Sequence, residues 1–166
     1  MAGTGALGRL KAKVASSLSR RPKDGRGSPA GRVDDHAGTG GIAVSYAPER
    51  DGDADPGEVV WTWVPFEDDP SQGKDRPVLV LGWDGPKLAA VQLSSKDHAQ
   101  RRDAHEWVEV GRGGWDPQNR VSFADASRLL RVEPSAVRRE GASLDQRAFD
   151  RVLARVGELH GWTDQP

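Results

Sequence analysis

The sequence predicts a mainly β domain, a small bent sheet or barrel that ends in one helix and follows a disordered N-terminal tail. Residues 57–132 alternate short runs of β-branched and aromatic residues with turns rich in Gly, Pro and Asp, which is typical of such folds. Residues 149–159 carry apolar side chains at helical spacing. Residues 1–56 offer few large apolar side chains, so burial cannot offset the cost of ordering them. We therefore divide the chain into an extension, 1–56, and a domain, 57–166.

Composition narrows the classes of protein to consider. The 166 residues include no Cys, which excludes a disulfide framework, a thiolate nucleophile and a thiolate zinc site. No apolar run is long enough to cross a membrane, and the first residues lack the apolar stretch of a secretory signal, so we expect a cytoplasmic protein without membrane contact.

The extension is itself divided by charge. Residues 1–32 hold eight basic residues and one acidic residue, whereas residues 33–56 hold one basic residue and six acidic ones. Four apolar residues in the basic part recur at helical spacing, and they are Leu7, Leu10, Val14 and Leu18. This pattern is consistent with either a contact arm or a solvated tail.

The strands are predicted from apolar runs between turn signals. The first, 58–64, follows the turn signal Asp55, Pro56 and Gly57, and a polar loop from Pro65 to Lys74 comes after it. Four further strands are expected at 77–82, 87–94, 105–110 and 127–132. Trp61 and Trp63 share one strand face, so they belong either to the core or to an exposed platform that stacks on bases.

The last element is predicted to be a helix. Its apolar face consists of Phe149, Val152, Leu153, Val156 and Leu159. Ser143 and Gln146 have the spacing of a capping box, and Gly161 is a plausible stop.

The sequence shows no self-evident catalytic motif. The four histidines, His36, His98, His105 and His160, lack metal-site spacing, and neither a nucleophile elbow nor a phosphate-binding loop is present. We expect no metal and no cofactor. His98 follows the third strand and belongs either to a site there or to a surface loop.

The loop after the first strand is acidic. It contains Glu67, Asp68 and Asp69 close together in sequence. These carboxylates are either solvated or ligands of a divalent ion.

An ordered set of residues resembles the MazF/PemK family of toxins. The set begins with Gly57, Glu58 and Trp61, passes a loop with Gly73, and reaches Arg76 before Pro77 and an apolar strand. It continues with the hydroxyl pair Ser94 and Ser95, then Ser122 with the strand 126–132, and ends in the helix that follows residue 141. The resemblance spans residues 57–160.

This resemblance implies a small, strongly bent barrel similar to the Src-homology-3 barrel, of the MazF/CcdB type, that forms a homodimer. It implies the toxin of a type II toxin–antitoxin system, which cleaves single-stranded RNA, usually messenger RNA, without a metal. The RNA would lie in a groove at the dimer interface, which the cognate antitoxin blocks. Arg76 and Ser94 match the family's catalytic positions. Position alone suggests five RNA-binding residues, namely Lys74, Gln92, Ser95, Lys96 and His98.

The residue types suit this chemistry. Cleavage by the ribose 2′-hydroxyl requires a proton acceptor, a proton donor for the departing 5′-oxygen, and stabilisation of the charge on phosphorus. An arginine fork and a serine hydroxyl can supply the third requirement. Without the resemblance, the residues favour an exposed Arg76 that pairs with Asp75 or with the backbone. Ser94 and Ser95 would then form a turn at the end of a strand.

The sequence is also compatible with two other functions. One is a catalytically inactive barrel, a decayed toxin that binds an antitoxin-like peptide or nucleic acid. The other is a gyrase-directed toxin, because CcdB proteins share the barrel and act through their C-terminal residues, and Trp162 is a C-terminal aromatic here. Trp83, Trp107 and Trp115 are candidates for either a dimer interface or the core.

Overall fold

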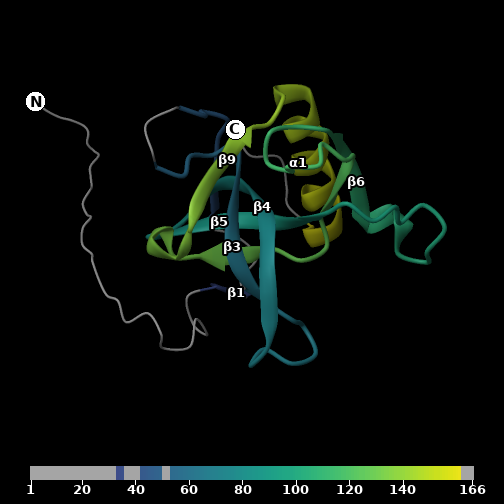
Figure 1. Cartoon of the computed structure of the whole chain (residues 1–166), viewed down its shortest axis with the longest axis horizontal. Helices are drawn as coiled ribbons and strands as arrows, with labels where there is room; N and C mark the ends of the chain where they lie inside the picture. Colours follow the sequence, from purple (N-terminus) through teal and green to yellow (C-terminus); the bar gives the residue numbers. More distant parts are fainter. Residues whose placement is uncertain (1–32, 36–41, 50–52, 162–166) are drawn as a thin grey trace, which may run out of the picture.

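Antiparallel strands make up most of the structure, a computed structural model that describes residues 33–35, 42–49 and 53–161 (Figure 1). The described strands are β1 (Val33–Asp35), β2 (Ile42–Val44), β3 (Glu58–Pro65), β4 (Gly73–Asp84), β5 (Lys87–Ser94), β6 (Trp107–Gly111), β7 (Ser122–Asp125), β8 (Leu130–Val132) and β9 (Arg139–Ser143). Two short 3-10 segments, η1 (Ala104–Glu106) and η2 (Pro134–Ala136), precede β6 and β9, and the helix α1 (Gln146–His160) ends the fold. Within these ranges, no helix is both long and apolar enough to span a membrane.

The sheet bends at β5. The main strand order is β1-β8-β5-β4-β3-β9, and β6 and β7 form a second branch from β5. Residues Leu88 to Ala90 of β5 pair with β8, whereas Leu93 and Ser94 pair with β7. The strands β7 and β8 thus pair with the same edge of β5 at different positions along it, so the sheet cannot stay flat there. The end of β5, with Ser94, therefore lies at the bend.

The two faces of the bent sheet pack into separate apolar clusters. The first cluster joins α1 to the sheet and includes Leu79, Leu93 and Phe149. The second lies on the opposite face of the strands and includes Val78, Leu130 and Val33 of β1. Side chains along a strand alternate between faces, so the odd and even positions of β4 and β5 supply different clusters.

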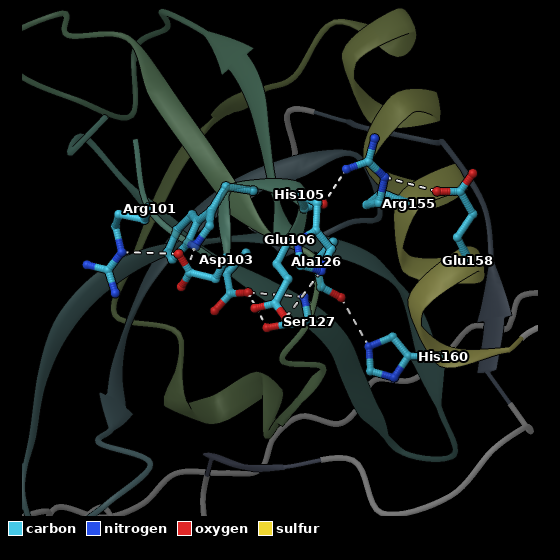
Figure 2. Close-up of polar contacts among 11 residues, drawn as sticks. Arg101, Asp103, His105, Glu106, Ala126, Ser127, Arg155, Glu158 and His160 are labelled. Carbon is cyan, nitrogen blue, oxygen red and sulfur yellow. Dashed lines mark hydrogen bonds and ion pairs between the residues drawn. The ribbon is translucent and has the colours of Figure 1, made fainter. Parts of the chain in front are cut away.

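The helix is fixed to the sheet at its C-terminal end. His160 lies 3.0 Å from the carbonyl oxygen of Ala126, and Arg155 donates a hydrogen bond to the carbonyl of His105, at the start of the β6 branch (Figure 2). Gly161 ends the helix with a φ of 69°, a left-handed conformation that glycine adopts without strain. The predicted stop at Gly161 is confirmed.

The predicted capping box at the helix start is wrong. The N-cap is Asp145, whose carboxylate accepts a hydrogen bond from the amide of Ala148 at 3.1 Å. Ser143 instead ends β9 and pairs with Glu58 of β3. The β3–β9 pairing keeps residue 143 in an extended conformation, so Ser143 cannot cap the helix. The carboxylate of Asp145 caps the unpaired amides of the first helical turn instead.

The described part of the extension contains structure that its composition did not predict. Val33–Asp35 and Ile42–Val44 form strands that pair with β8 and β4. Tyr46 packs on Phe149, with ring centroids 5.3 Å apart, and its hydroxyl donates to the carbonyl of Leu144 at 2.6 Å. A few apolar residues dock onto a sheet that already exists, so they need no core of their own. The stretch 7–18 and His36 lie outside the described residues, as does Trp162.

The remaining strand predictions agree in part with the structure. The predicted strands at 58–64 and 87–94 coincide with β3 and β5, and 77–82 is the apolar centre of the longer β4. The strand expected at 127–132 is only Leu130–Val132. The strands β7 and β9 were not predicted, because Ser122–Asp125 is very short and Arg139–Ser143 lacks any β-branched or aromatic residue.

Candidate active site

Arg76 and Ser94 lie on the same face of two neighbouring strands. Arg76 of β4 pairs directly with Thr62 of β3. On its other side β4 pairs with β5, and the last pair of that ladder is Val78 with Gln92, two residues from Arg76 and two from Ser94. Side chains alternate along a strand, so the two candidate catalytic side chains share the face of Val78, which belongs to the second apolar cluster.

Ser94 lies where β5 ends. Its hydroxyl oxygen accepts a hydrogen bond from the amide of Lys96 at 3.1 Å, which makes the first turn after the strand. This contact uses a lone pair and leaves the O–H free to donate. Ser94 is half-buried, whereas Ser95 and Lys96 are exposed. The turn expected from the two serines is thus present. Ser94 is the last residue of β5, whereas Ser95 lies in the turn.

Arg76 is half-buried beside a second cation. Burial of its guanidinium lowers its pKa from the ordinary value, and the charge of Arg128 lowers this pKa further. Among the described residues, no carboxylate lies within ion-pair distance of Arg76. The alternative pairing with Asp75 is not formed, and Asp75 instead accepts a hydrogen bond from Arg138. Within the described part of the chain, the guanidinium of Arg76 therefore has no anionic partner.

Gln92 is held in place by a buried carboxylate. Its amide donates to Asp125 Oδ2 at 3.3 Å, and the other oxygen, Oδ1, accepts from the amide and hydroxyl of Ser127 at 3.0 and 2.6 Å. Asp125 is 7% exposed. This network orients Gln92 on the face that carries Arg76. Asp125 was not predicted as a site residue. An Asp followed two residues later by Ser is typical of a turn but does not indicate the contact with Gln92.

His98 lies inside the loop that follows β5. It is 6% exposed, stacks on Trp107 with ring centroids 3.7 Å apart, and meets Phe123 edge-on. Neither of its ring nitrogens has a hydrogen-bond partner among the described residues. Its pKa is lowered, chiefly because burial disfavours the charged ring. A surface loop does not describe His98, whose ring is covered.

Lys74 and Trp61 lie on opposite faces of the sheet. Lys74 pairs with Val64 two positions before Arg76, so it projects on the same side, and it is exposed. Trp61 donates its indole N–H to the carbonyl of Trp115 at 3.0 Å and is half-buried. This contact favours a packing role for Trp61 over a stacking platform.

The three tryptophans considered for an interface differ in burial. Trp115 is buried in the first apolar cluster, and Trp107 is half-buried under His98. Trp83 is 38% exposed. Of the three, Trp83 alone presents a large apolar surface to solvent.

The acidic loop borders a pocket on the same face. Asp69 accepts from the amide and hydroxyl of Ser71, which closes a tight turn. In the described ranges, no three His, Asp or Glu side chains gather closely enough to hold a metal ion. The pocket has a volume of about 210 Å³, and its lining comes from β1, the acidic loop and Arg128: Val33, Asp34, Asp35, Pro65, Phe66, Glu67, Pro70 and Arg128.

The chain thus folds into a small, bent antiparallel β domain with the half-buried Arg76 on one face and a helix on the other. Residues 55–160 match the family model of PemK-like, MazF-like toxins of type II toxin–antitoxin systems, and the chain belongs to this family. This assignment confirms the predicted family and fold class. Among curated proteins the sequence has no match.

Solved structures of similar fold include toxins with their antitoxins. An endoribonuclease from Mycobacterial species in complex with its cognate antitoxin is 14% identical, covers 72% of this chain and 100% of its own, and has a TM-score of 0.50. The Form-II MazE–MazF structure from Deinococcus radiodurans is 21% identical, with coverage of 68% and 100% and a TM-score of 0.49. At 14% identity, the likeness to the mycobacterial structure concerns the fold alone.

Proposed function

We propose that this toxin is an endoribonuclease that cleaves single-stranded RNA, such as messenger RNA, by attack of a ribose 2′-hydroxyl on the adjacent phosphate. The observation that carries the proposal is the half-buried guanidinium of Arg76, which has no carboxylate partner among the described residues and lies on the same sheet face as Ser94. Family membership adds support, because a similar fold belongs to a protein described as an endoribonuclease.

The reaction needs little from the protein beyond charge and orientation. The 2′-oxygen forms a bond to phosphorus while the bond to the 5′-oxygen breaks, which leaves a 2′,3′-cyclic phosphate and a 5′-hydroxyl. The 2′ proton is lost, and the leaving oxygen gains one. Negative charge grows on the non-bridging oxygens, where Arg76 donates from its planar fork and Ser94 donates its O–H. Low solvent exposure strengthens both interactions.

Four of the other five candidate residues contact the RNA in this proposal. Lys74 and Lys96 are exposed cations at the edge of the face and bind backbone phosphates. Gln92 presents a fixed amide that is suited to a base edge. Ser95 adds a hydroxyl at the turn, while His98 positions the loop from beneath. The protein acts as a cytoplasmic homodimer and is held inactive by a cognate antitoxin, as the antitoxin complex of the mycobacterial relative suggests.

The test is cleavage of a long mixed-sequence RNA by the purified full chain in the presence of chelator, with the cut ends mapped. Wild type should cut at a short recurring sequence and leave 5′-hydroxyl ends. Arg76→Ala should lower the rate about 100- to 1,000-fold, the cost of removing a donor to developing charge. The matched control is Arg147→Ala, an exposed arginine on α1 and on the other side of the sheet, which should keep full activity.

A 2′-deoxy nucleotide at the mapped site distinguishes this mechanism from attack by water, because it removes the nucleophile and should abolish the cut. Intact RNA with a folded, dimeric protein would contradict the proposal and favour the catalytically inactive binding module. Cleavage that persists at the 2′-deoxy position would retain the nuclease but reject the nucleophile.

A further inference from the structure

Gln92 lies on the same sheet face as the proposed catalytic pair. It pairs across the strands with Val78 of the second apolar cluster, and Ser94 follows two residues later on the same strand. Its side chain is half-buried. An amide has two unlike ends, a carbonyl oxygen that accepts hydrogen bonds and an NH2 group that donates them. What Gln92 can recognise therefore depends on which end of its amide the protein holds.

Asp125 determines the orientation of this amide. The Nε2 atom of Gln92 donates to Asp125 Oδ2 at 3.3 Å. A carboxylate only accepts hydrogen bonds, so the nitrogen of the amide has to face it. Asp125 is 7% exposed, which leaves water little access to replace the contact. The other end of the amide, Oε1, has no hydrogen-bond partner among the described residues.

The carboxylate of Asp125 is itself fixed by the turn that follows it. Its Oδ1 accepts from the amide and the hydroxyl of Ser127 at 3.0 and 2.6 Å. A backbone N–H can only donate, so the atom at the Oδ1 position has to be an acceptor. Asp125 also belongs to β7, where it pairs with Trp107 of β6. Strand and turn together hold Oδ2 toward Gln92.

We propose that Asp125 makes Gln92 a hydrogen-bond acceptor toward the RNA, so that this pair of residues selects an amino base, adenine or cytosine, over a keto base, guanine or uracil. Adenine and cytosine carry an exocyclic amino group that donates to Oε1. Guanine and uracil have a carbonyl oxygen at the corresponding position, where two acceptors repel. The inference rests on the proposed function for its choice of RNA as the ligand. Asp125 acts through Gln92 and is a positioning residue.

The variant Asp125→Asn should turn the Gln92 amide around. The oxygen of the new side chain has to take the place of Oδ1, because the amide of Ser127 still donates there. Its NH2 group then faces Gln92 and donates to Oε1, which leaves the NH2 group of Gln92 for the RNA. A donor at that place favours keto bases. A reversed preference is a result that a merely structural role of Asp125 would not produce.

The experiment measures binding apart from cleavage in the full-length protein. The probes are oligocytidine and oligouridine of about 12 nucleotides with 2′-O-methyl groups throughout, which lack the nucleophile and cannot be cut. Wild type should bind the cytidine probe about tenfold more tightly than the uridine probe, as expected for one contact to a base edge. Asp125→Asn should invert this ratio. Gln92→Met keeps the length of the side chain without its amide and should bring the ratio to about one.

The matched control is Asp150→Asn, which removes the same charge from an exposed position on α1 and should keep the wild-type ratio. An unchanged ratio in Asp125→Asn or in Gln92→Met would overturn the inference, even if wild type cleaves RNA. An inverted ratio in Asp125→Asn while no variant cleaves unmodified RNA would support the base readout and reject the nuclease. Circular dichroism of each variant should match that of wild type. If Asp125→Asn does not fold, the ratio in Gln92→Met decides.

Discussion

His98 and Trp107 stack face to face, with ring centroids 3.7 Å apart and ring planes 4° from parallel. The stack joins the loop after β5 to the first residue of β6. It covers both nitrogens of His98, which have no hydrogen-bond partner among the described residues. The neutral ring therefore packs as an aromatic side chain, and burial disfavours its protonation.

This stack predicts a loss of stability in mild acid. The folded-state pKa of His98 lies below its ordinary value of about 6.5, so below that pH the unfolded chain binds more protons and the free energy of unfolding falls. The loss begins near pH 6.5 and continues down to the folded pKa. His98→Phe keeps the stack without titrating, so denaturant titrations from pH 7.5 to 5 should show a flatter profile than wild type. His98→Gln should flatten the profile equally while lowering stability at every pH, and a steep profile in both variants would disprove the assignment.

The two serines after β5 should differ in their effect on catalysis. Ser94 shares the strand face with Arg76, whereas Ser95 is exposed and follows the strand. Ser94→Ala should lower the cleavage rate about 100-fold, as expected for a lost donor to developing charge, and Ser95→Ala should lower it only slightly. Single-turnover rates on a defined oligonucleotide measure both. A larger loss in Ser95→Ala would place the functional hydroxyl at residue 95.

Tyr46 should stabilise the protein by packing the extension onto the domain. Tyr46→Phe removes the hydrogen bond to Leu144 and should lower the free energy of unfolding by about 1 kcal/mol. Tyr46→Ala also removes the contact with Phe149 and should cost about 3 kcal/mol. Urea denaturation of both variants, beside a chain that begins at residue 57, checks the predicted boundary. Equal stability of the shortened and full chains would show that residues 42–49 are dispensable.

Asp116 should protect the protein against acid. Its pKa is lowered chiefly by hydrogen bonds from Arg120, assisted by the amides of Gln118 and Arg120. Because the folded pKa lies below the ordinary value of 3.8, this stabilisation is present above that pH and is lost as the pH falls through the folded pKa. Asp116→Asn should lower stability at pH 7 by about 1 to 3 kcal/mol, and the difference from wild type should shrink below pH 4. A constant difference from pH 7 to 3 would contradict this role.

Local patterns predicted the elements that carry strong periodic or turn signals. The strand β3 follows a turn whose Gly57 has a φ of 99°, and the helix has an apolar face that packs through Phe149 and Val152. The helix start was misplaced because two capping signals lie two residues apart, and the choice between Ser143 and Asp145 depends on how far β9 pairs with β3.

The family and its fold class followed from the order of residues along the chain, and so did Arg76 and Ser94 as a candidate pair. Their placement on one face required the register of β4 and β5, which pairing of the whole sheet decides. Asp125, Arg128 and Asp35 carried no local signal, because each acts through a partner distant in sequence. Spacing along a chain determines which side chains an element presents, but strand pairing determines which side chains distant in sequence meet. Tertiary structure alone therefore decided that Asp35 of the extension pairs with Arg128.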